Sequence, residues 1–267
     1  MLMTLVIGGV GFVGLLIGSF LNVVVWRVPR GESIVSPASA CPACGTPITP
    51  RDNVPVLSWL LLRGRCRSCG DAISSRYPLV ELATAVSFGL VALGAVAGLW
   101  PWAVTPALLA FAAISISLTL IDLDVHRLPD AIVLPAYPVL AALLALASLL
   151  TGEWAALAAA LAGAGILFAV YFLIAFLAPR GGMGFGDVKL AGVIGLMLGW
   201  FGWAPLIVGA FAAFLVGGLY AIVLLLLRRA RRGDGVPFGP WMLVGAWIGI
   251  AAGDPIASLY LSAAGLG

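Results

Sequence analysis

Charged residues are scarce in this chain of 267 residues: together they make up 9% of it, whereas 63% is hydrophobic. A soluble domain cannot bury that much apolar surface, so the composition excludes a soluble globular protein and indicates several membrane crossings. The apolar runs are continuous rather than alternating, which disfavours a β-barrel. The first run lacks a preceding basic segment and is too long for the core of a signal peptide, so we expect a retained helix.

The lengths of the apolar runs predict an all-α polytopic membrane protein with about eight transmembrane helices, since about 20 apolar residues cross a bilayer. The sixth run is short and rich in glycine, so it fits a full crossing least well. Abundant Gly and Ala allow these helices to approach closely in lipid. The expected spans are 2–26, 79–99, 104–123, 131–150, 155–177, 187–201, 204–227 and 238–262.

Lysine occurs once, and all 14 basic residues fall in four segments: 27–78, the 124–130 loop, the turn after the fifth span and the loop after the seventh. With eight spans these segments share one side, which the positive-inside rule makes cytoplasmic. The cluster RRARR at 228–232 is then expected to be a topology anchor that binds anionic lipid. The chain divides into a first transmembrane helix (1–26), a small cytoplasmic insert (27–78) and a transmembrane core (79–267).

Cysteine occurs four times, in two C-x-x-C pairs of the insert that are separated by 21 residues: Cys41 and Cys44, then Cys66 and Cys69. This spacing is typical of a four-cysteine zinc site, and the glycine after each pair tolerates the positive φ of such a turn. Disulfides are the weaker alternative in a reducing cytoplasm, with free thiols as another. Four cysteines fill the coordination sphere, so we expect a structural zinc that stabilises a segment too small for a large core.

Two of the few acids, Asp122 and Asp187, are expected at the same membrane depth. Asp122 lies in the last turn of the third span, and Asp187 opens the sixth after the glycine-rich stretch RGGMGFGDVKL at 180–190. The span count places both at the cytoplasmic edge, although they are 65 residues apart. A helix N-terminus favours a carboxylate, and glycines at 181, 182, 184 and 186 allow close backbone approach. Charges at this depth are costly and usually functional.

Several interpretations of these acids remain open from the residues alone. Asp187 could be a helix N-cap, and Asp122 or Asp124 a solvated helix end paired with Arg127. Two carboxyls in one site could instead share a proton, so that one activates water while the other polarises a carbonyl, as in an aspartyl peptidase. A proton-coupled transporter uses similar residues as a relay, and a membrane scaffold with a zinc module for binding a secretion component is a third possibility.

Neighbouring polar residues have similar alternatives. Lys189 could pair with a carboxylate of the site or extend to the membrane interface. Asp124 is turned about 200° around an ideal helix from Asp122, so we expect a supporting or solvated group. The stretch VPFGP at 236–240 is either an irregular, substrate-facing start of the last span or a simple break. No glycine-rich nucleotide fingerprint of the Rossmann type is present.

An ordered set of motifs resembles the type IV prepilin peptidases, the bifunctional leader peptidases and N-methyltransferases of pilus and type II secretion systems. The matching stretches are GSFLNVVVWRVPRGES (18–33), CPACGTPI (41–48), DNVPVLSWLLLRGRCRSCG (52–70), ISSRYPLVEL (73–82), IDLDVHRLPD (121–130), GMGFGDVKLAG (182–192) and VPFGP (236–240).

The resemblance implies that Asp122 and Asp187 are the catalytic pair, with Gly184, Gly186 and Lys189 supporting them. It implies cleavage of prepilin or pseudopilin leaders at the cytoplasmic membrane face. The new N-terminus, usually Phe, is then methylated with S-adenosylmethionine, an activity associated with the insert. The expected location is the bacterial inner membrane as a multi-pass protein, with the zinc insert and the active site on the cytoplasmic side. The expected partners are substrate and membrane lipid, with no nucleic acid.

The resemblance also suggests roles for acids outside the catalytic pair. A basic leader needs acidic or polar contacts, for which Glu32, Asp52, Asp71 and Asp130 are available. Glu81 is either an interfacial acid near Arg76 or part of the methyl-transfer surface.

Overall fold

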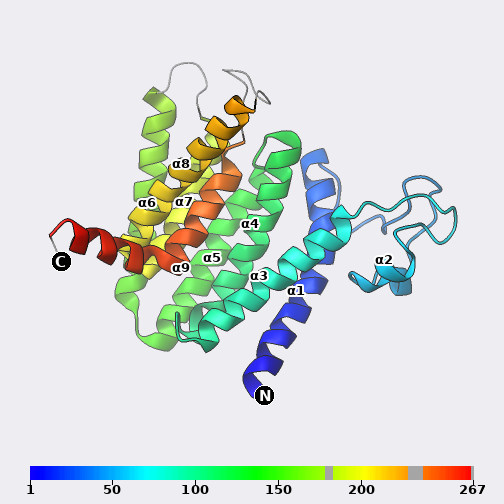
Figure 1. The fold of residues 1–267 in the computed structure, drawn as a ribbon, viewed down its shortest axis with the longest axis horizontal. Helices are drawn as coiled ribbons and strands as arrows, with labels where there is room; N and C mark the ends of the chain where they lie inside the picture. Colours follow the sequence, from blue (N-terminus) through cyan, green and yellow to red (C-terminus); the bar gives the residue numbers. More distant parts are fainter. Residues whose placement is uncertain (178–182, 228–236, 266–267) are drawn as a thin grey trace. The chain divides into compact units, whose positions relative to one another are not determined.

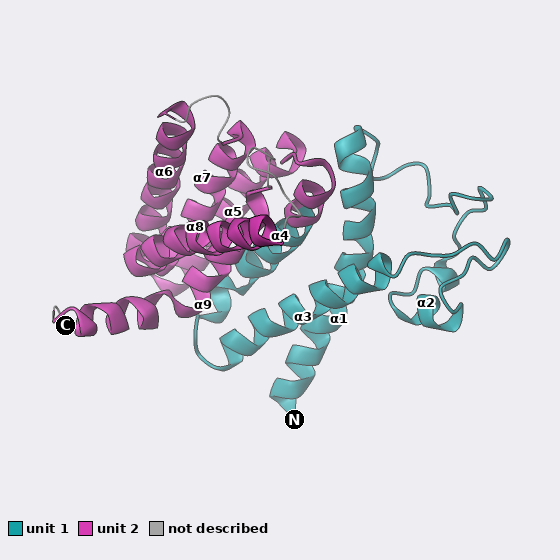
Figure 2. Cartoon of the chain, turned by 45° about the horizontal axis from the view of Figure 1, so that its top comes forward, with its two compact units in different colours: residues 1–117 teal, residues 118–267 magenta. Residues whose placement is uncertain are grey.

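The computed structural model describes residues 1–177, 183–227 and 237–265 (Figure 1). The chain forms two compact units, Met1–Ser117 and Leu118–Gly267 (Figure 2). The boundary between the two units falls within one helix. It does not test the functional division into 1–26, 27–78 and 79–267, so that division stays a prediction. The basic cluster at 228–232, Gly181, Gly182 and Val236 lie outside the described residues.

Helices are the regular secondary structure of the described ranges, and the insert consists mainly of turns and irregular chain with two isolated β-bridges. The predicted all-α class is therefore confirmed. The α-helices are α1 (Leu2–Arg27), α2 (Leu57–Leu61), α3 (Arg76–Val96), α4 (Thr105–Val125), α5 (Asp130–Thr151), α6 (Trp154–Leu177), α7 (Phe185–Phe201), α8 (Trp203–Leu226) and α9 (Gly239–Ala263), with short 3-10 turns at Val28–Arg30, Pro50–Asp52 and Trp102–Val104.

Seven of these helices are long and apolar enough to cross a membrane, counting only the described residues: α1, α3, α4, α5, α6, α8 and α9. They correspond in order to seven of the eight expected spans. The polytopic membrane class predicted from composition is thus confirmed. The remaining expected span, 187–201, corresponds to α7.

Helix α7 differs from the others in length and in burial. Its 17 residues extend about 26 Å at 1.5 Å per residue, less than the hydrocarbon core of about 30 Å. Yet 12 of its 17 residues are buried, because α5, α6, α8 and α9 all pack against it. Protein rather than lipid surrounds α7, so it is the central helix of the second unit and does not need the length of a lipid-facing span.

Small residues bring the helices together, as the Gly and Ala content predicted. A Cβ added to Gly163 of α6 would lie 2.5 Å from the carbonyl oxygen of Gly195 in α7. A Cβ on Gly245 of α9 would lie equally close, 2.5 Å, to the carbonyl oxygen of Gly209 in α8. In the first unit, one on Gly18 of α1 would lie 2.6 Å from the Cα of Glu81 in α3. Close backbone contact of this kind is how helices associate in lipid.

The insert is anchored to the paired helices α1 and α3 of the first unit by polar contacts. The Glu81 side chain is only 7% exposed, and its Oε2 accepts a hydrogen bond from the Val56 N–H at 2.7 Å. Arg27, the last residue of α1, donates to the carbonyl oxygens of Ser33 and Pro37 at 2.9 and 2.8 Å. Glu81 is therefore a buried acceptor for the backbone just before α2.

Candidate functional site

Asp122 lies in the last turn of α4 and is almost completely buried, at 5% exposure. Its Oδ2 accepts a hydrogen bond from the backbone N–H of Gly239 at 3.1 Å. Gly239 is the first residue of α9, so the carboxyl group sits at a helix N-terminus, where unpaired N–H groups favour negative charge. Sequence reasoning did not find this partner; the only signal was the Gly-Pro pair in VPFGP.

Asp187 is the third residue of α7 and is half-buried. Its Oδ2 accepts a hydrogen bond from the N–H of Gly184 at 3.2 Å, and its own N–H donates to the carbonyl oxygen of Gly184 at 3.0 Å. Gly184, not Asp187, occupies the N-cap position. The carboxyl group nevertheless caps its own helix from the third position, as the acid of a capping box does. The helix-capping interpretation of Asp187 therefore describes a real contact.

One apolar side chain, Leu128 of the loop between α4 and α5, lies beside a glycine neighbour of each acid. Gly186 directly precedes Asp187 in α7, and Gly239 is the residue whose N–H bonds Asp122. A Cβ on Gly186 would lie 3.1 Å from the Leu128 Cβ, and one on Gly239 would lie 3.2 Å from the Leu128 Cδ2. The described residues of the second unit thus bring the two acids together, although they are far apart in sequence.

Three further polar residues lie near these acids in the sequence. The Nζ of Lys189 lies 2.7 and 2.8 Å from the two carboxylate oxygens of Asp130, so its ion pair is with Asp130 and not with Asp122 or Asp187. Asp124 is exposed where Asp122 is buried, in agreement with the expected rotation around α4. Asp130 was one candidate for contacting a basic leader, and here it is already paired.

The four cysteines of the insert meet in one cluster, with their Sγ atoms all within 4.8 Å of one another. The Sγ atoms of Cys41 and Cys69 are 3.8 Å apart, and all four residues are free of disulfides. Four sulfurs placed tetrahedrally about 2.3 Å from a zinc ion would be about 3.8 Å apart. The cluster therefore fits a tetrahedral metal ion and not a pair of disulfides.

The two C-x-x-C turns have the same backbone structure. In the first, Gly45 N–H donates to the Cys41 carbonyl at 2.9 Å, and in the second Gly70 N–H donates to the Cys66 carbonyl at 2.9 Å. The two glycines have φ values of 70° and 75°, a left-handed conformation that other residues adopt only with strain. Hydrogen bonds with Thr46 lower the pKa of the Cys44 thiol to about 6.

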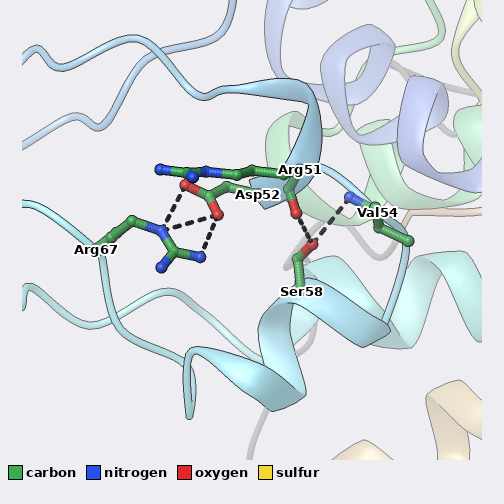
Figure 3. Close-up of polar contacts among 5 residues, drawn as sticks. All are labelled: Arg51, Asp52, Val54, Ser58 and Arg67. Atoms are coloured by element: carbon green, nitrogen blue, oxygen red, sulfur yellow. Dashed lines mark hydrogen bonds and ion pairs between the residues drawn. The ribbon is translucent and has the colours of Figure 1, made fainter.

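A polar network braces the insert around the second turn (Figure 3). The Arg67 guanidinium bonds both carboxylate oxygens of Asp52, with its Nη2 2.6 Å from Oδ1, and these bonds lower the pKa of Asp52. Ser58 Oγ donates to the carbonyl of Arg51 at 2.9 Å and accepts from Val54 N–H at 3.0 Å. Asp52, another candidate for binding a basic leader, is thus already engaged by Arg67.

Comparison with known proteins relates these features to a family. Residues 12–95 match the bacterial peptidase A24 N-terminal domain, and residues 108–222 match the type IV leader peptidase family. The chain belongs to the type IV leader peptidase family. The acids of the candidate site up to Asp187 fall within the second match, and all four cysteines fall within the first. This type IV leader peptidase is accordingly an aspartic-type peptidase with methyltransferase activity.

Similar proteins share nearly the whole length of this peptidase. Three are named prepilin leader peptidase/N-methyltransferase: from Aeromonas salmonicida, 37% identical over 93% of this chain and 91% of the relative; from Pseudomonas aeruginosa, 38% identical over 94% and 92%; and from Neisseria gonorrhoeae, 39% identical over 91% and 89%. No solved structure matches the chain.

Proposed function

We propose that this peptidase removes the basic leader of prepilins or pseudopilins by a two-aspartate mechanism and then methylates the new N-terminus with S-adenosylmethionine. The observation that carries the proposal is the pair of carboxyl groups of Asp122 and Asp187: each accepts a bond from a backbone N–H at a helix start, and Leu128 packs beside the glycine next to each of them. The names of the relatives supply the substrate and the methyl transfer.

The chemistry follows from placing two carboxyl groups together. Repulsion between two negative charges favours a state in which the pair holds one proton. The ionised group then takes a proton from water as the water attacks, and the protonated group polarises the scissile carbonyl. The proton taken from water then passes to the leaving amine as the C–N bond breaks, which leaves a carboxyl group and a new N-terminus. Gly184 and Gly186 have no side chains that would push the turn before Asp187 away from its neighbours. Lys189 supports the same turn through its ion pair with Asp130. The proposed mechanism therefore gives a role to each site residue of the IDLDVHRLPD and GMGFGDVKLAG motifs named above.

The location of the active site is part of the proposal. We place the insert and both aspartates on the cytoplasmic side of the bacterial inner membrane, because one assignment of the spans puts every basic residue on one side. The apolar part of a prepilin would lie among the membrane helices, with the scissile bond at the interface. Membrane lipid is the other partner, and we assign no nucleic acid.

One experiment tests both activities together. The full chain, reconstituted in liposomes, is incubated with a prepilin and S-adenosylmethionine carrying a labelled methyl group. We expect a shortened product by electrophoresis, and label at its N-terminus by mass spectrometry. If the prepilin stays intact while a pH gradient drives solute flux through the same liposomes, the peptidase proposal is wrong and the proton-coupled transporter is favoured.

We further propose that Cys41, Cys44, Cys66 and Cys69 hold one structural zinc ion. We expect elemental analysis to find about one zinc per chain, because the four thiolates complete a tetrahedral site. Cys41→Ser should lower this content severalfold and expose the insert to protease, whereas Ser68→Ala, an exposed change in the second turn, should alter neither. A folded wild-type protein without bound metal would contradict the assignment.

A further inference from the structure

We propose that Asp130, Tyr137 and Lys189 form a bracket that fixes α7 against α5 and thereby positions Asp187 opposite Asp122. The inference rests on the proposed function and assigns positioning residues to that reaction. It gives Asp130 a role other than binding the leader. We call these three residues the α5–α7 bracket.

The bracket holds one residue of α7 at two points. The Lys189 ammonium bonds both oxygens of Asp130 at 2.7 and 2.8 Å, and the Tyr137 hydroxyl donates to the Lys189 carbonyl oxygen at 2.7 Å. Asp130 and Tyr137 are seven residues apart on α5, so both lie on the same face. At Gly192, a Cβ would collide with the Tyr137 hydroxyl. The sequence therefore leaves space for this contact on the adjoining turn of α7.

Fixing α7 to the start of α5 also fixes it relative to Asp122. Asp130 is the first residue of α5 and follows the end of α4 after a loop of four residues. Leu128 of that loop packs against Gly186, the residue just before Asp187. The segment that follows Asp122 thus contacts the first turn of α7 at both ends. Leu128 packs against Gly186 at one end, and Asp130 pairs with Lys189 at the other.

A bracket is needed because the turn that carries Asp187 is poorly constrained by its own sequence. Gly184 and Gly186 flank Phe185 at the start of α7, and glycine has more backbone freedom than any other residue. Asp187 is only half-buried, and its described hydrogen bond is to Gly184 itself. Two catalytic groups must be held within a fraction of an ångström for efficient reaction. Contacts from a rigid neighbouring helix supply that constraint.

The test compares Asp130→Asn, Lys189→Met and the double variant in reconstituted full-length protein. We expect each single change to lower kcat for leader cleavage about tenfold with KM nearly unchanged, since a misplaced catalytic group slows the chemical step. The double variant should also lose about tenfold rather than about 100-fold, because residues acting as a pair are not additive. Tyr137→Phe should reduce kcat less, and methyl transfer to an already cleaved pilin should be unchanged and serves as the check on folding.

The outcomes separate this inference from the proposed function. Unchanged kcat in Asp130→Asn, or full additivity of the two changes, would overturn the bracket. A raised KM with unchanged kcat would also overturn it and would show that Asp130 binds the leader. If Asp187→Asn itself cleaves normally, the proposed function fails instead. Lys189→Arg, which keeps the charge, should retain most of the activity if the bracket is correct.

Discussion

Replacing either Asp122 or Asp187 with asparagine is expected to reduce leader cleavage by at least about 100-fold, the range that general acid–base groups contribute. Asparagine keeps the size and the hydrogen-bonding oxygen of the side chain, so the bonds from Gly239 and Gly184 can persist. It cannot take a proton from water at neutral pH. The loss should therefore appear in single-turnover cleavage of a prepilin, without a change in the amount of folded protein.

The matched control is Asp254→Asn, which changes an exposed acid within α9. It should cleave at the wild-type rate. Either catalytic variant cleaving at the normal rate would show that the pair is wrongly assigned. Thermal unfolding in detergent shows whether an inactive variant is still folded. We expect transitions close to that of the wild-type protein, because the hydrogen bonds to the backbone are kept.

Replacing Gly239 with alanine is expected to reduce cleavage by up to about 100-fold, although no ionisable group is changed. A Cβ at this position would lie 2.8 Å from the Asp122 Oδ2 and 3.2 Å from the Leu128 Cδ2. The backbone N–H that bonds Asp122 is retained in alanine, so the variant isolates the steric effect. Displacing a catalytic carboxyl group by about 1 Å costs about 100-fold in rate. The measurement is kcat for the same prepilin.

Gly218→Ala in α8 is the matched control for this change, because a Cβ there would meet nothing within 4 Å. It should leave cleavage unchanged. If Gly239→Ala is as active as the control, then close contact between α9 and Asp122 is not needed for the reaction. The comparison separates a general effect of alanine for glycine in a membrane helix from the specific contact with Asp122.

The two carboxyl groups occupy similar local environments that come from different parts of the chain. Asp187 is held at the start of its own helix, α7, whereas Asp122 comes from the end of α4 and is held at the start of α9. In each case a helix N-terminus offsets part of the cost of a negative charge near the membrane. The proximity of the two charges opposes this effect, so together the two influences suit a pair that shares one proton.

The sequence by itself determined the features that depend on short stretches. The apolar runs predicted the helices because length and hydropathy decide membrane crossing locally. The C-x-x-C-G pattern predicted two metal-binding turns with left-handed glycines, and Gly45 and Gly70 have that conformation because each turn is closed within the five residues of the pattern.

Only the tertiary structure decided which side chains meet. The partners of Asp122 and Lys189 are Gly239 and Asp130, which are 117 and 59 residues away in the chain. Uniformly apolar helices carry little periodic signal for their packing faces, so the sequence does not say which helix contacts which. The burial of α7 among four other helices likewise depends on small residues such as Gly163 and Gly195 meeting across an interface. Complementary shape, which exists only once the helices are together, selects those contacts.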